Sequence, residues 1–258
     1  MIAYRTFRPP HVPSAAFEEF LREQAGRDLT ALTGSFPTAW KAYPMGGLLR
    51  DMLLKQMLSV EVKPADLDLV IFGAGSIDEI RSKLGNANQS TNAFGGAKCQ
   101  IHSDGLIFDL WRVEDHTNMA KAPKPHTIEQ LLRHNLLDID AILWEPATGC
   151  LHDCGCLQAI TAGCIGLVGE EGISEKFAAA QVAHALAVAY KVNFPLSDDV
   201  RRFVAKASEQ CPRADIERIL ERKLPHAAIQ LKAFWNDILS GGTQACPAPT
   251  RTTITARP

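Results

Sequence analysis

The sequence predicts a mixed α/β domain, in which helices flank a small mixed sheet, followed by an all-helical domain. Up to about residue 150, strand-like segments with alternating apolar or β-branched residues are interspersed with helical segments, and beyond Gly155 the apolar pattern is helical. With 258 residues, the chain is long enough for one large domain or two small ones with a buried core. We expect an N-terminal arm and helix over 1–35, the mixed domain over 36–150, the helical domain over 151–240 and a disordered tail over 241–258.

Composition and charge restrict the class of protein. The 46% hydrophobic and 22% charged content is ordinary for a soluble globular chain. A formal charge of −2 gives no overall attraction to nucleic acid, so an anionic substrate would need a local basic patch or metal ions. No apolar run approaches the roughly 20 residues that cross a bilayer, and the N-terminus lacks the layout of a secretory signal, so we expect a cytoplasmic protein without a membrane partner. The 7 cysteines are an odd number and predict reduced thiols.

Local patterns justify the first elements in turn. Residues 1–13 contain several Pro and Arg residues and predict an extended arm, and Ser14 is a suitable N-cap for a following helix. Alternating residues predict a strand over 39–45, which runs through a double glycine into a helix over 48–54. The run from Asp66 to Gly73 combines alternation, β-branched residues and a terminal glycine, and predicts a strand.

Capping and turn residues define the later elements. Ser76, with Glu79 three residues later, predicts a capping box on a helix that ends near Leu84. Residues 99–102 and 105–112 predict a hairpin that turns at Ser103–Asp104. The remaining patterns predict a polar loop (113–126), a helix capped by Thr127 and ending near His134, a strand (139–144), and helices over 174–192, 198–208, 215–222 and 225–239.

Two aspartates on the strand that begins at residue 66 are candidates for chemistry. Asp66 and Asp68 are two residues apart, so their side chains leave the same face of a strand. Neighbouring carboxylates repel each other unless a proton or a cation neutralises them, and Mg²⁺ prefers hard oxygen ligands together with substrate phosphates. Because an Asp-x-Asp pair alone is also common at solvated strand ends, its companions in the sequence decide its meaning.

Three further features of the sequence support a site for metal and phosphate. Gly46-Gly47, at a strand-to-helix turn, permits close backbone approach, and the helix that follows offers free N–H groups. Arg50-Asp51 comes one helical turn later and brings a guanidinium that can bind a phosphate. Asp109 lies on a strand expected beside the first, where a third carboxylate can complete a metal cage or accept a proton. Arg112 points to the opposite face of an ideal strand and would need a bend to join them.

A second cluster contains possible zinc ligands. Cys150, His152, Cys154 and Cys156 fall within seven residues. Their alternate spacing suits a strand or turn, whereas zinc motifs separate paired ligands by two to four residues. Buried thiols are therefore the preferred interpretation, and zinc binding is the alternative.

The segments 43–54 and 65–70 together resemble the head domain of class II tRNA nucleotidyltransferases (CCA-adding enzymes) and poly(A) polymerases, in the DNA polymerase beta-type nucleotidyltransferase superfamily. The shared pattern is a double glycine, then Arg-Asp, then Asp-x-Asp at about this distance. Weaker similarity continues: 107–112 resembles the strand with the third acidic residue and an arginine, and 132–141, which includes Arg133, resembles the Arg-Arg-Asp-Phe-Thr-Ile-Asn-Ala segment. Residues 177–194 fall where the family has its neck helix.

The resemblance implies a polymerase-beta-like head followed by a neck-like helical domain. It implies a site in which Asp66, Asp68 and Asp109 hold Mg²⁺ or Mn²⁺, and in which a nucleotide is bound by Gly46, Gly47, Arg50, Asp51, Arg112 and Arg133. The chain departs from the family in the neck segment 177–187, which has no arginine, and in Arg133-His134-Asn135, where one guanidinium is lost. From the length of the chain, we also expect it to lack the long helical body with which those enzymes hold tRNA.

The expected function is therefore metal-dependent transfer of a nucleoside monophosphate from an NTP to a hydroxyl, with release of pyrophosphate. The resemblance favours an RNA or tRNA 3′ end as the acceptor; a small molecule or a protein hydroxyl is the alternative. A non-catalytic binding module with a degenerate head is the competing class. Basic residues of 201–223 are interleaved with acidic ones, which favours a solvated helix face over an RNA-binding patch. The sequence indicates neither the NTP nor the oligomeric state.

Overall fold

A computed structural model describes residues 2–7, 29–59, 66–85, 88–91, 95–101, 106–116 and 119–242. The chain divides into two compact units: Met1–Thr161 with Val168–Gly172, and Ala162–Leu167 with Ile173–Pro258. The first unit is a mixed α/β unit and the second is helical, which confirms the predicted fold class. The four predicted domain ranges stay predictions, and the observed hairpin of β7 and β8 extends across residue 150.

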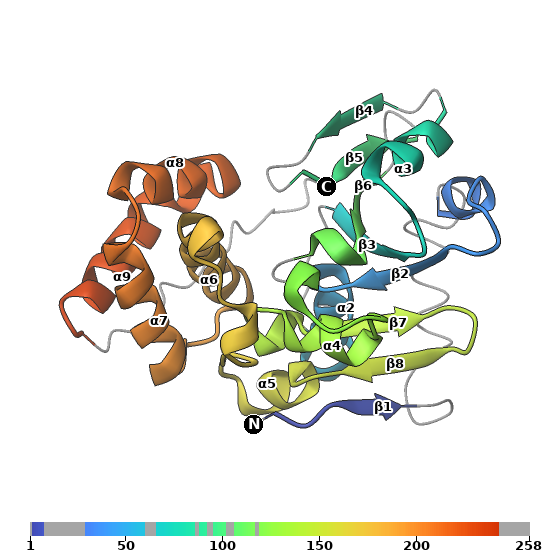
Figure 1. Cartoon of the computed structure of the whole chain (residues 1–258). Helices are drawn as coiled ribbons and strands as arrows, with labels where there is room; N and C mark the ends of the chain where they lie inside the picture. The colour runs from blue at the N-terminus through green and yellow to red at the C-terminus, as the bar shows by residue number, and fades with distance from the viewer. Residues whose placement is uncertain are drawn as a thin grey trace, which may run out of the picture. The chain divides into compact units, whose positions relative to one another are not determined.

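The first unit is built on a mixed sheet. In the described part of the chain this sheet has the strand order β1-β8-β7-β2-β3-β6-β5-β4 (Figure 1). β3 and β6 are parallel to each other, and the other neighbours are antiparallel. The strands are β1 (Arg5–Phe7), β2 (Lys41–Met45), β3 (Asp66–Phe72), β4 (Asn88–Thr91), β5 (Ala97–Gln100), β6 (Ile107–Arg112), β7 (Ile142–Glu145) and β8 (Cys150–Asp153).

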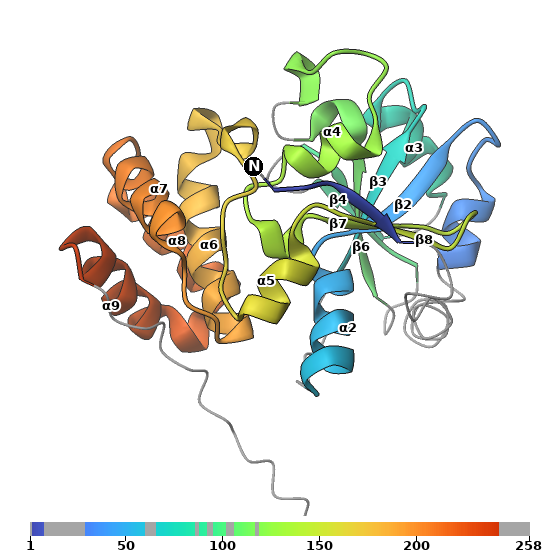
Figure 2. The same cartoon turned by 90° about the horizontal axis from the view of Figure 1, so that it is seen from below.

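Helices cover both faces of this sheet, with α2 on one face and α4 on the other (Figure 2). The α4 face buries a cluster that joins Tyr43, Val70 and Leu143 of the strands to Leu131 and Leu132 of α4. Alternate residues of a strand point to opposite faces, so the odd-numbered residues of β3 point to the face that α2 covers, and they are fully buried. The helices are α2 (Gly47–Leu58), α3 (Ile77–Lys83), α4 (Ile128–Arg133) and α5 (Cys156–Ala162), with 3-10 turns η1 (Val113–Asp115), η2 (Met119–Lys121), η3 (Asp138–Asp140) and η4 (Glu170–Gly172).

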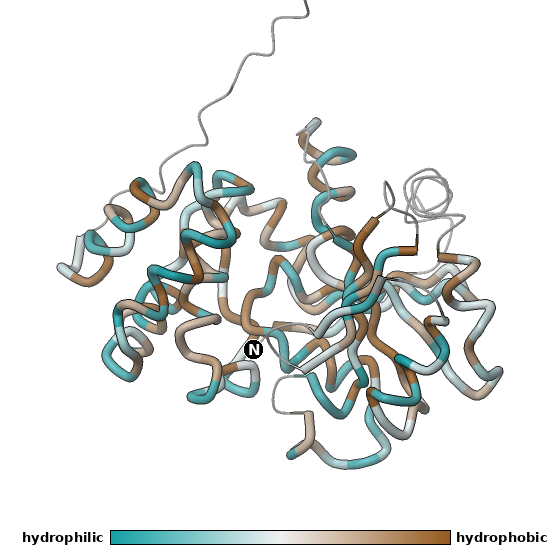
Figure 3. The backbone as a smooth tube through the Cα atoms, turned by 90° about the horizontal axis from the view of Figure 1, so that it is seen from above, coloured by the Kyte–Doolittle hydropathy of each residue, from teal (hydrophilic) through white to brown (hydrophobic). Residues whose placement is uncertain are grey.

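The second unit packs its helices around α6, which is buried over most of its length. Along these helices the tube in Figure 3 alternates between hydrophilic and hydrophobic residues, as amphipathic packing requires. Ile165 forms a parallel bridge with Leu196, which ties the first segment of this unit to the turn before α7. The elements are η5 (Glu175–Phe177), α6 (Ala178–Val192), α7 (Asp198–Glu209), α8 (Arg213–Lys223), η6 (Pro225–Ala227) and α9 (Ala228–Leu239).

Several local predictions can be compared with this structure. The predicted arm contains β1, which pairs with β8, so part of the arm is an edge strand of the sheet. The predicted strand over 139–144 begins later, as β7, because residues 138–140 form a 3-10 turn. Residues 29–34 are helical, as expected for the end of the helix from Ser14. The rest of that helix, the Ser103–Asp104 turn and most of the predicted tail lie outside the described residues.

Candidate active site

The sheet brings the three predicted aspartates together. Asp66 and Asp68 lie on β3, and Asp109 lies on β6 directly beside Asp68 in the parallel register. Because Asp66 and Asp68 are two residues apart and paired residues of adjacent strands share a face, all three carboxylates lie on the same face of the sheet. The strand parity predicted from the sequence is confirmed.

Mutual repulsion and burial act strongly on the central carboxylate of this acidic cluster. Burial, followed by the charges of Asp66 and Asp109, raises the pKa of Asp68 to about 7, although a hydrogen bond from the Trp111 side chain opposes the shift. Asp109 is also buried, with 7% of its surface exposed. Carboxylates in such an arrangement attract either protons or cations.

A lysine that was not predicted lies among these acids. Lys98 on β5 stands opposite Asp109 on β6, and its Nζ lies 3.2 Å from Oδ2 of Asp109 and 3.7 Å from Oδ2 of Asp66. Burial opposes its charge, but the carboxylates, Asp109 first, raise the pKa of Lys98 overall. The predicted hairpin contained the information needed to find it: five residues back from Ser103 and five forward from Asp104 reach Lys98 and Asp109 together.

The double glycine borders the acidic cluster. Met45, the last residue of β2, pairs with Asp68, so the turn that follows begins beside this carboxylate. Gly46 has a φ of 71° and a ψ of −132°, a conformation that is essentially restricted to glycine. A Cβ on Gly46 would lie 3.8 Å from Oδ2 of Asp68. The free N–H groups of the first turn of α2 therefore begin next to the acids.

Arg50 and Asp51 lie on α2, just after this turn. Arg50 is buried, with Nε 2.8 Å from Oδ1 of Asp51 and Nη1 2.5 Å from Oδ1 of Asp140. Although burial opposes the charge, Asp140 and Asp51 together raise the pKa of Arg50 above its usual range. Its guanidinium also lies against Gly47, where an added Cβ would be 3.3 Å from Nη2. The structure thus engages Arg50 with two carboxylates, and the predicted contact of Arg50 or Asp51 with a nucleotide stays a prediction.

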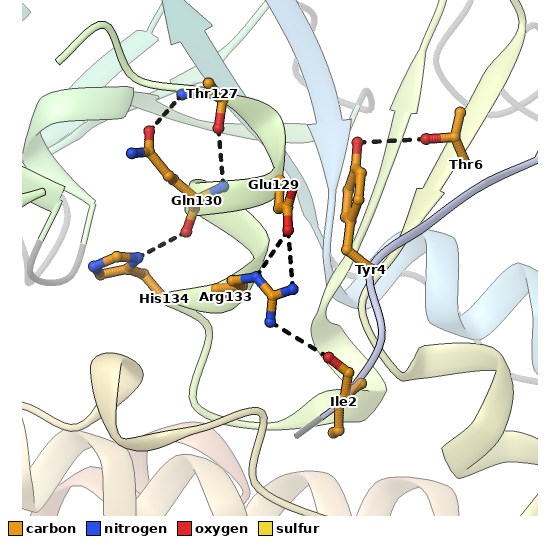
Figure 4. Close-up of polar contacts among 8 residues, drawn as sticks. All are labelled: Ile2, Tyr4, Thr6, Thr127, Glu129, Gln130, Arg133 and His134. Carbon is orange, nitrogen blue, oxygen red and sulfur yellow. Dashed lines mark hydrogen bonds and ion pairs between the residues drawn. The ribbon is translucent and has the colours of Figure 1, made fainter. Parts of the chain in front are cut away.

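The two other predicted arginines bind elsewhere in this unit. Arg112 lies on the opposite face of β6 from Asp109, as strand parity requires, and pairs with Asp115 at 3.0 Å and with the carbonyl of Gly75. Arg133 on α4 donates to Glu129 at 2.9 Å and to the carbonyl of Ile2 at 3.3 Å (Figure 4). No described contact joins either guanidinium to the acidic cluster.

The described residues contain no group of three or more His, Cys, Asp or Glu side chains arranged to hold a metal ion. This applies to the cysteine cluster, where His152 instead forms a hydrogen bond of 2.7 Å with the Tyr4 hydroxyl. Burial raises the pKa of the Cys156 thiol well above its ordinary value, which keeps it protonated and a poor ligand. It also applies to the three aspartates, between which Lys98 is inserted. Their oxygen donors nevertheless have the chemistry that a hard divalent cation prefers.

Three arginines of the C-terminal helices have acidic partners. Arg213 pairs with Glu217, Arg218 with Asp215, and Arg201 with Asp237. This pairing agrees with a solvated helix face in the second unit. Across the described ranges, no helix combines the length and hydrophobicity that a membrane span requires.

Comparison with known proteins places the fold. No protein-family model matches the sequence, and no curated protein does either. Among solved structures, the chain is similar to a CCA-adding enzyme in its apo form (TM-score 0.60, 19% identity, covering 90% of this chain and 54% of that one). It is similar to a CCA-adding enzyme in complex with ATP (TM-score 0.60, 19% identity, covering 96% of this chain and 58% of that one). It is also similar to the Thermotoga maritima CCA-adding enzyme complexed with tRNA (TM-score 0.57, 18% identity, covering 96% of this chain and 58% of that one).

The mixed sheet and the helices that follow it therefore define a nucleotidyltransferase-like fold. Solved structures with a similar fold include CCA-adding enzymes, and this chain spans a little over half the length of those compared.

Proposed function

We propose that this chain is a metal-dependent nucleotidyltransferase, which moves a nucleoside monophosphate from an NTP to a hydroxyl acceptor and releases pyrophosphate. One observation carries the proposal: Asp66, Asp68 and Asp109 gather on one sheet face beside Gly46 and the start of α2, within a nucleotidyltransferase-like fold. The neighbours in complex with ATP, CTP and tRNA support a nucleotide substrate.

Asp66 and Asp68 would hold Mg²⁺ or Mn²⁺, with Asp109 as a third ligand or as the base. When bound, such a cation neutralises phosphate charge and makes an attacking hydroxyl more acidic. The buried carboxylate of Asp109 can accept the proton that this hydroxyl loses.

The remaining residues would position the nucleotide. The N–H groups that follow Gly46 and Gly47 offer donors to the triphosphate without a side chain in the way. Arg50 is held by ion pairs with Asp51 and Asp140, lies against this turn, and is a positioning residue for it. Arg112 and Arg133 would contact the nucleotide only after leaving Asp115 and Glu129, so they are weaker candidates.

An RNA 3′ end, such as that of tRNA, is the acceptor that we favour, because the similar structures include a complex with tRNA. A small molecule or a protein hydroxyl is the alternative within the same chemistry. To distinguish them, the full chain is incubated with each labelled NTP, Mg²⁺, and total RNA and protein. Label in RNA supports the favoured acceptor, and label in protein or in a small product supports the alternative.

Asp68→Asn tests the role of the acids. The amide keeps the shape of the side chain but removes the charge, so the initial rate of transfer should fall at least about 100-fold, while the circular dichroism spectrum stays unchanged. Asp66→Ala and Asp68→Ala should each abolish transfer. The matched control is Asp78→Asn, which neutralises a carboxylate exposed by 83% on α3 and should retain the full rate. Undiminished labelling by the Asp66→Ala/Asp68→Ala double variant would contradict the proposal.

A second candidate function is a binding module without catalysis. It is favoured by the presence of Lys98 within the acids and by the engagement of Arg50, Arg112 and Arg133 in ion pairs. Titration calorimetry with NTP and Mg²⁺, followed by an assay for pyrophosphate release, separates the two. Binding without release supports the module, and release supports the enzyme.

A further inference from the structure

Lys98 places a fixed positive charge inside the acidic cluster. Its Nζ bridges Asp109 at 3.2 Å and Asp66 at 3.7 Å, and its side chain is exposed by only 33%. An ammonium group at these distances offers three N–H donors to carboxylate oxygens. It therefore forms ion pairs with two of the three acids that the proposed function assigns to divalent cations.

The sheet holds this lysine in place. β5 pairs with β4 on one side and with β6 on the other, so the backbone at Lys98 is hydrogen-bonded within a ladder. Its neighbours Ala97 and Cys99 are buried, with 0% and 2% of their surface exposed, on the opposite face. The ammonium can therefore leave this position only by rotation of its own side chain, which breaks an ion pair with Asp109 or Asp66.

Charge balance then limits how many divalent cations the cluster needs. Three ionised carboxylates and one ammonium leave a formal charge of two minus, which one divalent cation neutralises. A second divalent cation would bring an excess of positive charge close to Lys98, and repulsion between like charges at a few ångströms is strong in a partly buried site. Lys98 also faces Asp109 directly, where that second cation would require a ligand.

Resting on the proposed function, we propose that Lys98 is a tethered cation of the active site. It holds Asp109 and Asp66 in place of one divalent cation, and the chain without nucleotide takes up a single divalent cation, with Asp68 and Asp66 as its carboxylate ligands.

Mn²⁺ titration of the full chain without nucleotide tests this inference, with free Mn²⁺ measured by electron paramagnetic resonance. The wild-type chain should bind one Mn²⁺. Lys98→Met, which keeps the length of the side chain and removes its charge, should bind a second Mn²⁺, or bind the first at least about ten-fold more tightly. Lys98→Arg keeps the charge and should bind one. Lys83→Met removes an exposed lysine of α3 and is the matched control, which should behave like the wild type.

Two results would overturn the inference. One is a wild-type stoichiometry other than one, which needs no variant and so does not depend on whether Lys98→Met folds. The other is Mn²⁺ binding by folded Lys98→Met or Lys98→Gln that matches the wild type. Failure of the proposed function is distinguishable: a chain that transfers no nucleotide but gains a Mn²⁺ site in Lys98→Met retains the tethered cation and loses the enzymatic assignment.

Discussion

The guanidinium of Arg50 shows how one buried charge can organise the edge of the candidate site. It is 4% exposed and binds carboxylates from its own helix and from η3, which lies 90 residues further along the chain. The double glycine rests on this network, so the geometry of the turn depends on it. Arg50 contributes to the site by supporting the backbone next to Asp68.

Arg50→Met should destabilise the chain by about 3–5 kcal/mol, because it leaves Asp51 and Asp140 buried without this cation. The free energy of unfolding, measured by urea denaturation, checks this. Arg218→Met is the matched control, because Arg218 is 77% exposed in its pair with Asp215 and its removal should cost less than about 1 kcal/mol. Equal losses in the two variants would contradict the structural role of Arg50.

The same residues show which parts of the site could be predicted. Asp66, Asp68 and Asp109 were found because strand parity is a local property, readable from spacing alone. The ion pair between Arg50 and Asp140 could not be predicted, because the two residues are distant in sequence. The sequence around an aspartate also does not distinguish a buried carboxylate from a solvated one. Lys98 was within reach of the predicted hairpin register but carried no family motif.

Among the elements, α4 is a short helix with a reciprocal cap at its start. It has only six residues, and it places Leu131 and Leu132, both 0% exposed, against the sheet. Thr127 accepts from the Gln130 N–H at 3.2 Å, and the Gln130 side chain accepts from the Thr127 N–H at 2.9 Å (Figure 4). A helix this short cannot compensate for unsatisfied N–H groups by propagation.

Thr127→Ala and Gln130→Ala should each lower the free energy of unfolding by about 1 kcal/mol. The double variant should lose less than the sum of the two, because each variant already breaks the reciprocal box. Thr161→Ala is the control, since that hydroxyl bonds back to Leu157 within α5 and caps no N–H group. Losses that add up fully in the double variant would show that the two bonds act independently.

Whether an element could be predicted depends on how far apart in the sequence its interacting residues lie. The cap at Ser76 was predicted and is present, because it is encoded within four residues; its Glu79, however, accepts from the Gly75 N–H in place of the Ser76 N–H. α4 and its cap at Thr127 were predicted for the same reason, whereas the reciprocal bond from Gln130 was not. β1 was not, because three residues carry no periodicity and their partner strand begins about 140 residues later.

At the scale of the whole molecule, two partly buried groups give opposite dependences of stability on pH. Burial, with the charge of His134, lowers the pKa of His116 to about 4 from 6.5. Between these values the unfolded chain binds more protons at this residue, so stability is lost as the pH falls from about 6.5 to 4. Asp68, with its pKa raised to about 7, binds more protons when folded, so its contribution is lost as the pH rises from about 3.8 to 7.

In a single curve of unfolding free energy against pH, the two effects would therefore offset each other. The difference between the curves of the wild type and a His116 variant isolates the effect of His116. His116→Gln should remove a loss of up to about 3 kcal/mol that the wild type shows between pH 6.5 and 4, a figure that follows from about 1.4 kcal/mol per pKa unit. Urea unfolding of both chains across this range measures it. If Asp68 binds Mg²⁺ as the proposed function requires, Mg²⁺ should favour its ionised form and flatten the opposing slope in both chains alike, without changing their difference. Parallel curves for the wild type and His116→Gln would show that the imidazole of His116 does not cause the loss of stability at acidic pH.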